Sequence, residues 1–259
     1  MTAFVLVSGG YTGGWIWREV AALLREQGHT AHPVTLTGMG DRRHLAGADT
    51  DLDTHIEDIV QVLDHEDVSE AVMVGHCYGL HPALGAADRR AERVASVVYL
   101  DGGMPSDGDA GVDVMPEALR DRLLRRAAEL GGGRMAPPPP LDDKELWGDL
   151  TGVSPADRER MKRLAAPQPM GTLTQPLRLT GAATELPGTG VFCTANGLSI
   201  ALVEALVAAG DPRSARLTDP KVGYFDLDTG HYPMLSQPGE LTEVLIRAAA
   251  GEGRRLKRP

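Results

Sequence analysis

Cysteine is scarce in this chain of 259 residues, which contains only Cys77 and Cys193. Two cysteines provide no disulfide framework, so we expect a reducing, cytoplasmic environment. Long apolar runs are also missing, since none approaches the roughly 18 residues that a membrane span needs. Residues 1–10 lead directly into a short apolar stretch and lack the basic region that begins a signal peptide.

Excess positive charge is absent too. The formal net charge is -10, which argues against sequence-independent binding to nucleic acid or to an anionic membrane. The eight histidines show no ligand-like spacing with cysteines or carboxylates, so we expect no metal. No phosphate-binding loop is present, and we expect no cofactor.

Short apolar runs alternate with helical patterns, which predicts an α/β fold with a mostly parallel sheet flanked by helices. The length favours one large domain over two independent ones. The expected strands are residues 4–7, 31–36, 71–74, 95–100, 191–193 and 222–227. The expected helices are residues 15–27, 52–64, 80–90, 198–209 and 238–250.

This alternation stops between residues 105 and 187. That stretch contains a glycine run, a proline run and helical patterns at 117–130 and 155–164, with no convincing strand. We predict a helical cap at 105–187 over a core formed by residues 1–104 and 188–259. The basic tail at 254–258 is expected to be a frayed, solvated end.

The strongest motif is Gly75-His76-Cys77-Tyr78-Gly79, which follows an apolar strand and opens a helix. This is the context of a nucleophile elbow, a tight turn that pushes its central residue out above the sheet. A helix N-terminus also lowers the pKa of a thiol. The motif predicts Cys77 as a nucleophile; a small buried cysteine in a turn is the alternative.

Partners for Cys77 are expected at the ends of later strands. His231 follows the strand at 222–227 and is predicted to be the base. Asp101 ends the strand after the nucleophile strand and is predicted to orient His231. Asp228 is the second choice for the acid. The loop after the second-last strand offers Asn196 and no carboxylate.

The glycine-rich loop at residues 8–14 is expected to form half of an oxyanion hole. Its donor would be the backbone N–H of Gly10, together with that of Tyr78. A dinucleotide-binding loop is excluded because a G-x-G-x-x-G frame ending at Gly13 would start on Ser8. The substrate-binding residues are predicted to be Tyr11, Trp15, His76 and Tyr232, and Trp17 is a further candidate for the pocket wall.

These segments together resemble the α/β-hydrolase superfamily, in its branch of esterases, hydroxynitrile lyases and salicylate-binding proteins. The matching stretches are FVLVSGGYTGGWIW (4–17), VTLTGMGDR (34–42), LDTHIED (52–58), VGHCYGL (74–80), VVYLDGGMP (97–105) and LDTGHYPML (227–235). The chain departs from this branch at three positions. Cys77 replaces the usual serine, Ser8 the usual histidine of the oxyanion loop, and Leu80 a frequent glycine.

A Cys–Asp–His triad on this fold is similar to that of the Dieckmann cyclases of tetramate antibiotic pathways. Asp101 and His231 lie 24 and 154 residues beyond Cys77, which suits that group. The resemblance implies a β-ketoacyl-aminoacyl thioester, delivered by an acyl or peptidyl carrier protein and released from a Cys77 acyl-enzyme as a tetramic acid or pyridone. Basic residues in the predicted cap helices would meet an acidic carrier, or would simply form solvated faces.

Three other hypotheses fit the same residues. The first is an esterase or thioesterase with a cysteine nucleophile. The second is a non-catalytic protein that binds small molecules, because this fold has been reused for that purpose. The third is an ordinary serine esterase in which Cys77 has replaced the serine.

Overall fold

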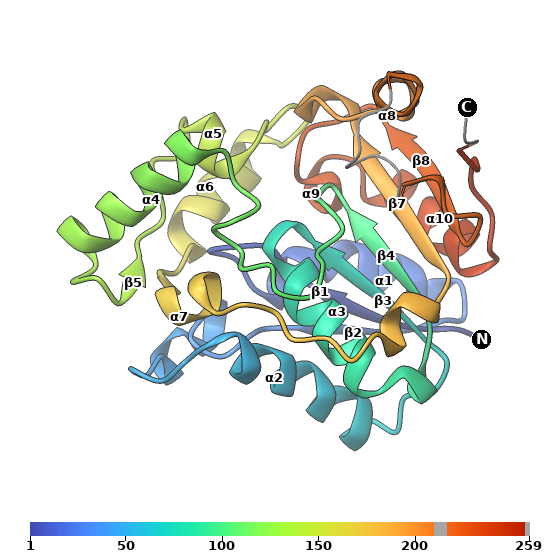
Figure 1. The fold of residues 1–259 in the computed structure, drawn as a ribbon, viewed down its shortest axis with the longest axis horizontal. Helices are drawn as coiled ribbons and strands as arrows, with labels where there is room; N and C mark the ends of the chain where they lie inside the picture. Colours follow the sequence, from blue (N-terminus) through green and yellow to red (C-terminus); the bar gives the residue numbers. More distant parts are fainter. Residues whose placement is uncertain (210–216, 257–259) are drawn as a thin grey trace.

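The computed structural model describes residues 1–209 and 217–256. Its centre is a six-stranded sheet, in the order β2-β1-β3-β4-β7-β8, in which every pairing is parallel (Figure 1). The strands are β1 (Ala3–Val7), β2 (Thr30–Val34), β3 (Ala71–His76), β4 (Val94–Leu100), β7 (Gly188–Cys193) and β8 (Val222–Leu227). The predicted fold class is therefore confirmed.

Helices cover both faces of the sheet because successive right-handed crossovers run in opposite directions from β1. Helices α2 and α3 pack together on one face, and α1 and α10 pack together on the other (Figure 1). The core helices are α1 (Arg18–Glu26), α2 (Leu52–His65), α3 (Leu80–Arg89), α8 (Ile200–Ala208), α9 (Pro233–Ser236) and α10 (Pro238–Ala249).

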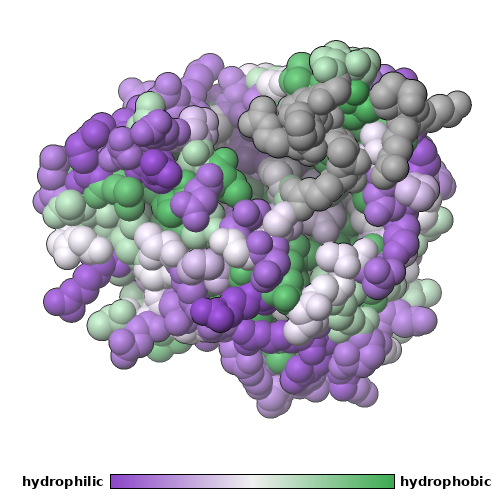
Figure 2. All heavy atoms as spheres, viewed as in Figure 1, coloured by the Kyte–Doolittle hydropathy of each residue, from purple (hydrophilic) through white to green (hydrophobic). Residues whose placement is uncertain are grey.

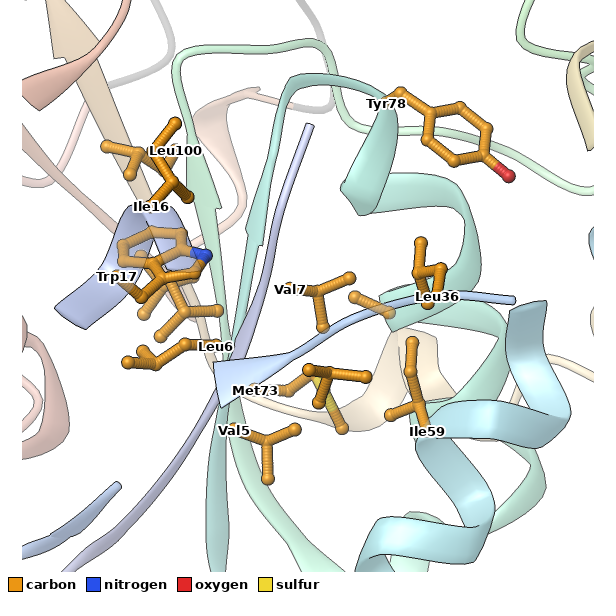
Figure 3. Packing of buried hydrophobic residues seen from close by; sticks show 14 of the residues in the cluster. Val5, Leu6, Val7, Ile16, Trp17, Leu36, Ile59, Met73, Tyr78 and Leu100 are labelled. Atoms are coloured by element: carbon orange, nitrogen blue, oxygen red, sulfur yellow. The ribbon is translucent and has the colours of Figure 1, made fainter. Parts of the chain in front are cut away.

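Strand β1 shows why the central strands are continuously apolar. Phe4 to Val7 have no exposed surface, since helices cover both sides of the sheet. Leu6 lies with Ile16 and Trp17 on one side, whereas Val7 lies toward Leu36 and α2 on the other (Figure 3). Trp17 is thus a core residue and does not line a pocket, contrary to the alternative considered from the sequence.

Local capping sets where several helices begin. The Asp51 side chain accepts from the Thr54 N–H at 2.9 Å, and the two residues form a capping box at the start of α2. Ser199 caps α8 in the same way, so this helix begins at Ile200 rather than at the predicted 198. Residues 14–17 form a 3-10 turn, and α1 therefore starts at Arg18 rather than at 15.

The segment between β4 and β7 contains the helices α4 (Glu117–Leu130), α5 (Lys144–Trp147), α6 (Pro155–Leu164) and α7 (Met170–Thr174). These helices gather to one side of the sheet (Figure 1). We refer to residues 105–187 as the cap segment; its division from the core at these bounds stays a prediction. The prediction that this segment contains no strand was wrong, because β5 (Met135–Ala136) pairs with β6 (Gln168–Pro169). Two-residue strands are too short to leave a periodic pattern.

Two further expectations need correction. The strand predicted at 191–193 begins at Gly188, since glycine in Gly188-Thr189-Gly190 hides the strand signal. The tail is not frayed at Arg254, which exchanges two backbone hydrogen bonds of 2.9 Å with Tyr224, and Leu256 is buried. Residues 257 and 258 lie outside the described residues. Within residues 1–209 and 217–256, no helix is both long and apolar enough to cross a bilayer.

The turn from β3 into α3 packs backbone against backbone at the end of β1. A Cβ added to Gly79 would lie 2.6 Å from the carbonyl oxygen of Ser8 and 2.9 Å from that of Val7. Both oxygens are backbone atoms, one at the last residue of β1 and one just beyond it, so neither can swing aside as a flexible side chain would. This contact explains why the second glycine of the elbow has no side chain.

We expect Gly79→Ala to lower the free energy of unfolding by about 2 kcal/mol or more, because the methyl group must displace strand backbone. Gly103→Ala is the matched control, since its Cβ would meet nothing within 4 Å. Its effect should stay within about 0.5 kcal/mol. Equilibrium urea denaturation of both variants measures the difference, and equal effects would contradict the packing argument.

Candidate active site

Cys77 occupies a strained turn directly after β3. Its φ is 52°, a left-handed backbone conformation that non-glycine residues rarely adopt. A Cβ on Gly75 would lie 2.9 Å from the Leu80 Cα, so this position also requires glycine. The thiol is partly exposed and lines a cavity. Such strain concentrates at functional sites, where surrounding packing holds it in place.

The structure brings His231 and Asp101 together, although they are 130 residues apart. His231 Nδ1 donates to Asp101 Oδ2 at 2.6 Å. The same carboxylate accepts from the Cys193 N–H at 3.0 Å through Oδ1. Burial alone would raise the pKa of Asp101, but these hydrogen bonds and His231 hold it below its ordinary value. Asp101 is thus a buried carboxylate that orients His231 and carries a negative charge.

Asp228, the second choice for the acid, lies elsewhere. It is exposed, and its Oδ1 accepts from the Thr194 hydroxyl at 3.1 Å. Asp228 follows β8 directly, and its side chain contacts Thr194 rather than His231. The geometry therefore favours Asp101 for the acid.

Asn196 is the residue that sequence reasoning did not assign. Its Nδ2 donates to Asp101 Oδ2 at 2.8 Å and lies 3.1 Å from His231 Nδ1. Its Oδ1 accepts from the Asp149 N–H at 2.8 Å. The position after the second-last strand was a signal for this role, but an uncharged side chain was not recognised as a partner of the acid.

His76 supports His231 from behind. Its Nε2 donates to the His231 carbonyl at 2.7 Å, and the two ring centroids are 4.5 Å apart. Burial is the main cause that lowers the pKa of His76 to about 3, so the ring is neutral. His76 does not line the cavity. His76 therefore helps to position His231 and does not make the predicted contact with substrate.

Charges of opposite sign are stabilised on Cys77 and His231. Burial alone would raise the pKa of the Cys77 thiol, but the charge of His231, its hydrogen bond and the Tyr78 N–H lower it below its ordinary value. Burial alone would lower the pKa of His231, yet the Cys77 thiolate and Asp101 raise it. The two groups therefore favour a thiolate–imidazolium pair, which is the reactive form of a cysteine nucleophile.

The cavity beside Cys77 has a volume of about 60 Å³. Apart from Cys77 and His231, the described residues that line it carry no charge. The lining residues are Gly10, Tyr11, Cys77, Tyr78, Met115, Leu123, Leu146, Gln168, Leu173, His231 and Tyr232. Tyr11 and Tyr232 thus lie where the sequence predicted substrate contacts.

Trp15 is not at the cavity. It is partly buried at a place outside the cavity, where the Arg160 guanidinium lies 5.0 Å from the centroid of its ring. The first turn after the oxyanion loop directs this side chain toward α6 and away from Cys77, so the predicted substrate contact is not made.

The two predicted oxyanion donors border the cavity near the thiol. Gly10, on the loop after β1, and Tyr78, which follows the nucleophile, line the cavity together with Cys77. The Tyr78 hydroxyl donates to Nδ1 of buried His55 at 2.8 Å, and His55 Nε2 donates to the Thr37 carbonyl at 2.8 Å. This chain of hydrogen bonds anchors the residue that follows the nucleophile.

The cap segment holds the loop that carries His231. The His231 N–H donates to the Asp149 carbonyl at 2.6 Å, and the Gly230 N–H donates to Thr151 at 3.2 Å. Gly148 has a φ of +77°, and a Cβ there would lie 2.6 Å from the His231 Cβ. The histidine and the cap segment therefore occupy one rigid arrangement.

Most basic side chains of the cap helices already have partners within the chain. Arg122 pairs with Asp143 and Glu145, and Lys162 with Glu159. Arg126 donates to the Pro138 carbonyl at 2.9 Å. The surface over α4 and α5 is largely hydrophilic (Figure 2). These contacts favour ordinary solvated helix faces over a dedicated docking surface.

Among residues 1–209 and 217–256, no group of three histidine, cysteine or acidic side chains is placed to hold a metal ion. The described residues instead place a cysteine in a strained turn, a histidine and a buried carboxylate at one edge of a parallel sheet. This is the arrangement that acyl-transfer enzymes with a nucleophile elbow use.

The chain belongs to the alpha/beta hydrolase family, whose model matches residues 4–244. It is 34% identical over 256 residues to the carbendazim hydrolyzing esterase of Nocardioides sp. (strain SG-4G), covering 95% of this chain and 98% of that protein. It is 25% identical over 260 residues to the putative chloroplastic methylesterase 14 of Arabidopsis thaliana, covering 95% and 71%.

Solved structures agree on the fold. An extracellular alpha/beta-hydrolase from a Paenibacillus species superposes with a TM-score of 0.75 at 19% identity, covering 96% of this chain and 99% of that one. Tomato methylketone synthase I gives a TM-score of 0.71 at 17% identity, covering 96% and 98%. The family model and the 34% identical esterase show that the protein is an enzyme of this family, and the predicted resemblance to its esterase branch is confirmed.

The lowered pKa of Cys77 predicts selective alkylation. Iodoacetamide should modify Cys77 at neutral pH. Plotted against pH, the alkylation rate should begin to fall only below the ordinary thiol pKa of about 8.5. Cys193 is the internal control, because burial raises its pKa and it has no exposed surface. In His231→Ala the main cause that lowers the Cys77 pKa is gone, so this fall should move to higher pH and the alkylation rate at pH 7 should drop about tenfold or more. Peptide mass mapping against pH measures both; equal labelling of the two cysteines would contradict the ion pair.

The acid assignment predicts unequal effects of two matched substitutions. Asp101→Asn should lower kcat/KM for an activated ester such as p-nitrophenyl acetate by about 10³-fold or more, because it removes the charge that holds the His231 imidazolium. Asp228→Asn should change it less than about twofold. Combining Asp101→Asn with Asn196→Asp should recover at least about tenfold, since Asn196 also borders His231 Nδ1. A larger loss in Asp228→Asn than in Asp101→Asn would overturn the assignment.

Proposed function

We propose that the protein is an esterase or thioesterase that cleaves small, uncharged acyl esters or thioesters through a Cys77 acyl-enzyme. The observation that carries this proposal is the Cys77–His231–Asp101 array beside a small uncharged cavity. The relatives support it, because their names describe a carbendazim hydrolyzing esterase and methylesterases. The uncharged lining favours neutral acyl groups, since it offers no partner for a charged one.

The geometry supports a two-step reaction. The Cys77 thiolate attacks the carbonyl carbon, and the N–H groups of Gly10 and Tyr78 stabilise the oxyanion. The leaving alcohol or thiol takes a proton from the His231 imidazolium, which leaves Cys77 acylated and His231 neutral. Neutral His231 then takes a proton from water, and the hydroxide attacks the thioester carbonyl. The carboxylic acid departs and the thiolate–imidazolium pair is restored.

One observation favours a second candidate, a Dieckmann-type cyclase. Cysteine stands where the esterase branch usually has serine, so a thioester substrate would remain a thioester on the enzyme. Its carbonyl accepts a carbon nucleophile well. In a β-ketoacyl-aminoacyl chain, His231 would remove the proton from the carbon between the two carbonyls. The carbanion would attack the carbonyl on Cys77, and ring closure would expel the thiolate. A carrier protein would be the partner in this case.

The non-catalytic alternative does not explain the site. A protein that only binds small molecules has no need for a strained cysteine, a histidine and a buried carboxylate held in one array. The strained backbone and the buried carboxylate are unfavourable for folding, and their combination is typical of a catalytic site.

Product analysis distinguishes the two enzyme candidates. The protein is incubated with a β-ketoacyl-aminoacyl N-acetylcysteamine thioester and the matching methyl ester, and products are separated by liquid chromatography and mass spectrometry. Hydrolysis to the free acid is the expected result, and a tetramic acid without free acid would establish the cyclase instead. Cys77→Ala should lower either turnover by at least about 10³-fold. Unchanged turnover in Cys77→Ala would overturn both candidates.

A further inference from the structure

The polar side chain beside the oxyanion loop is Gln168, which comes from the cap segment. Its side chain is 1% exposed and lines the cavity next to Cys77. Its Oε1 lies 2.9 Å from the position that a Cβ on Gly10 would occupy. Within the described ranges, no N–H or O–H group of the protein donates to this oxygen. The oxygen is thus an open acceptor next to the proposed oxyanion donor of Gly10.

Hydrogen bonds determine which end of the Gln168 amide faces the cavity. The Thr172 hydroxyl donates its single proton to the Pro169 carbonyl at 2.7 Å. Thr172 Oγ1 accepts from Gln168 Nε2 at 3.0 Å, and the Tyr78 side chain is a further hydrogen-bond partner of Thr172. With the Thr172 proton on the Pro169 carbonyl, a rotated amide would place two acceptors against each other. This arrangement turns Oε1 toward the Gly10 side.

The backbone around Gln168 is held at several points. Its strand β6 pairs with β5, and the Ala166 N–H donates to the Tyr11 carbonyl at 2.9 Å. The Met170 N–H donates to the Arg134 carbonyl at 2.8 Å. Two of these contacts lie within the cap segment and one reaches the oxyanion loop itself. Gln168 and Gly10 are therefore kept at a constant separation.

An acceptor in this place selects substrates by what they donate. A substrate whose carbonyl oxygen binds Gly10 and Tyr78 would bring its neighbouring atoms against Oε1. If those atoms lack a donor, the substrate displaces water from a buried oxygen and leaves it without a hydrogen bond, which is unfavourable. If they include N–H or O–H, the oxygen is satisfied.

On this basis we propose that Gln168 is a specificity-determining residue that accepts a hydrogen bond from an N–H or O–H group on the carbon next to the reacting carbonyl. The proposal rests on the esterase or thioesterase function of Cys77 and names its substrate class. N-acylaminoacyl esters and thioesters belong to this class, because their amide N–H occupies that position. Simple aliphatic acyl groups, which lack such a donor, are expected to react more slowly.

The test compares two substrates in two proteins, the wild type and Gln168→Leu, in the manner of a double-mutant cycle. N-acetylglycyl and 4-oxopentanoyl N-acetylcysteamine thioesters differ only in an N–H that is replaced by CH₂. We compare their kcat/KM values, and the acylation of Cys77 by mass spectrometry, in the wild type and in Gln168→Leu. The preference of the wild type for the N–H substrate should fall about tenfold in the variant. Taking this ratio of preferences cancels the difference in intrinsic reactivity of the two thioesters.

A second pair of variants applies if Gln168→Leu does not fold. Thr172→Val removes the hydroxyl that orients the amide, whereas Thr174→Val on the same helix removes one that donates only to the Met170 carbonyl, at 3.0 Å. The preference should fall in Thr172→Val and stay within about twofold of the wild type in Thr174→Val. Equal preferences in these two variants would overturn the proposal.

The outcomes also separate this proposal from the function on which it rests. If the wild type is acylated by both thioesters and Gln168→Leu keeps the same preference, the role of Gln168 is overturned and the esterase function stands. If neither thioester acylates Cys77, both are overturned.

Discussion

The hydrogen bond between Asp101 and His231 is the interaction on which the rest of the site depends. It joins a carboxylate with almost no solvent contact to an imidazole that must carry a positive charge. A buried carboxylate is unfavourable unless donors surround it. Cys193, Asn196 and His231 together provide those donors. The retained negative charge raises the pKa of His231, and the charge of a protonated His231 in turn lowers the pKa of the Cys77 thiol.

Asn196 extends this arrangement into the cap segment. It contacts the acid and the base through Nδ2, and it accepts from the Asp149 N–H through Oδ1. Asp149 also accepts from the His231 N–H. One loop of the cap segment therefore orients the base from two directions. A displacement of this loop would disturb the site even though the loop supplies no reacting group, so the conformation of the cap segment and the reactivity of Cys77 are physically linked.

The sequence predicted the elbow, His231 and Asp101 because each lies at the end of an apolar strand, where a parallel sheet gathers side chains at one edge. It did not predict Asn196 or Gln168. Asn196 carries no charge, and its value arises only from its contact with Asp101. Gln168 lies in a strand of two residues that no periodicity reveals. The sequence predicts a place in the pocket for His76 and Trp15, which lie near the motifs, but strand and turn geometry direct both side chains away from it. Residues that act through a partner are visible only once the fold has brought the partner near.

The choice of cysteine has a consequence that connects the two candidate functions. In water, a thioester on Cys77 hydrolyses only when a base activates the attacking water, and His231 is free to do so once the leaving group has taken its proton. The same neutral imidazole is the base that cyclisation needs. The two reactions therefore share every step up to the acyl-enzyme and differ in which proton reaches His231 first. In either proposed reaction, the small cavity between the oxyanion loop and the cap segment would control that competition, because it would decide whether water or a carbon of the bound chain lies against the imidazole.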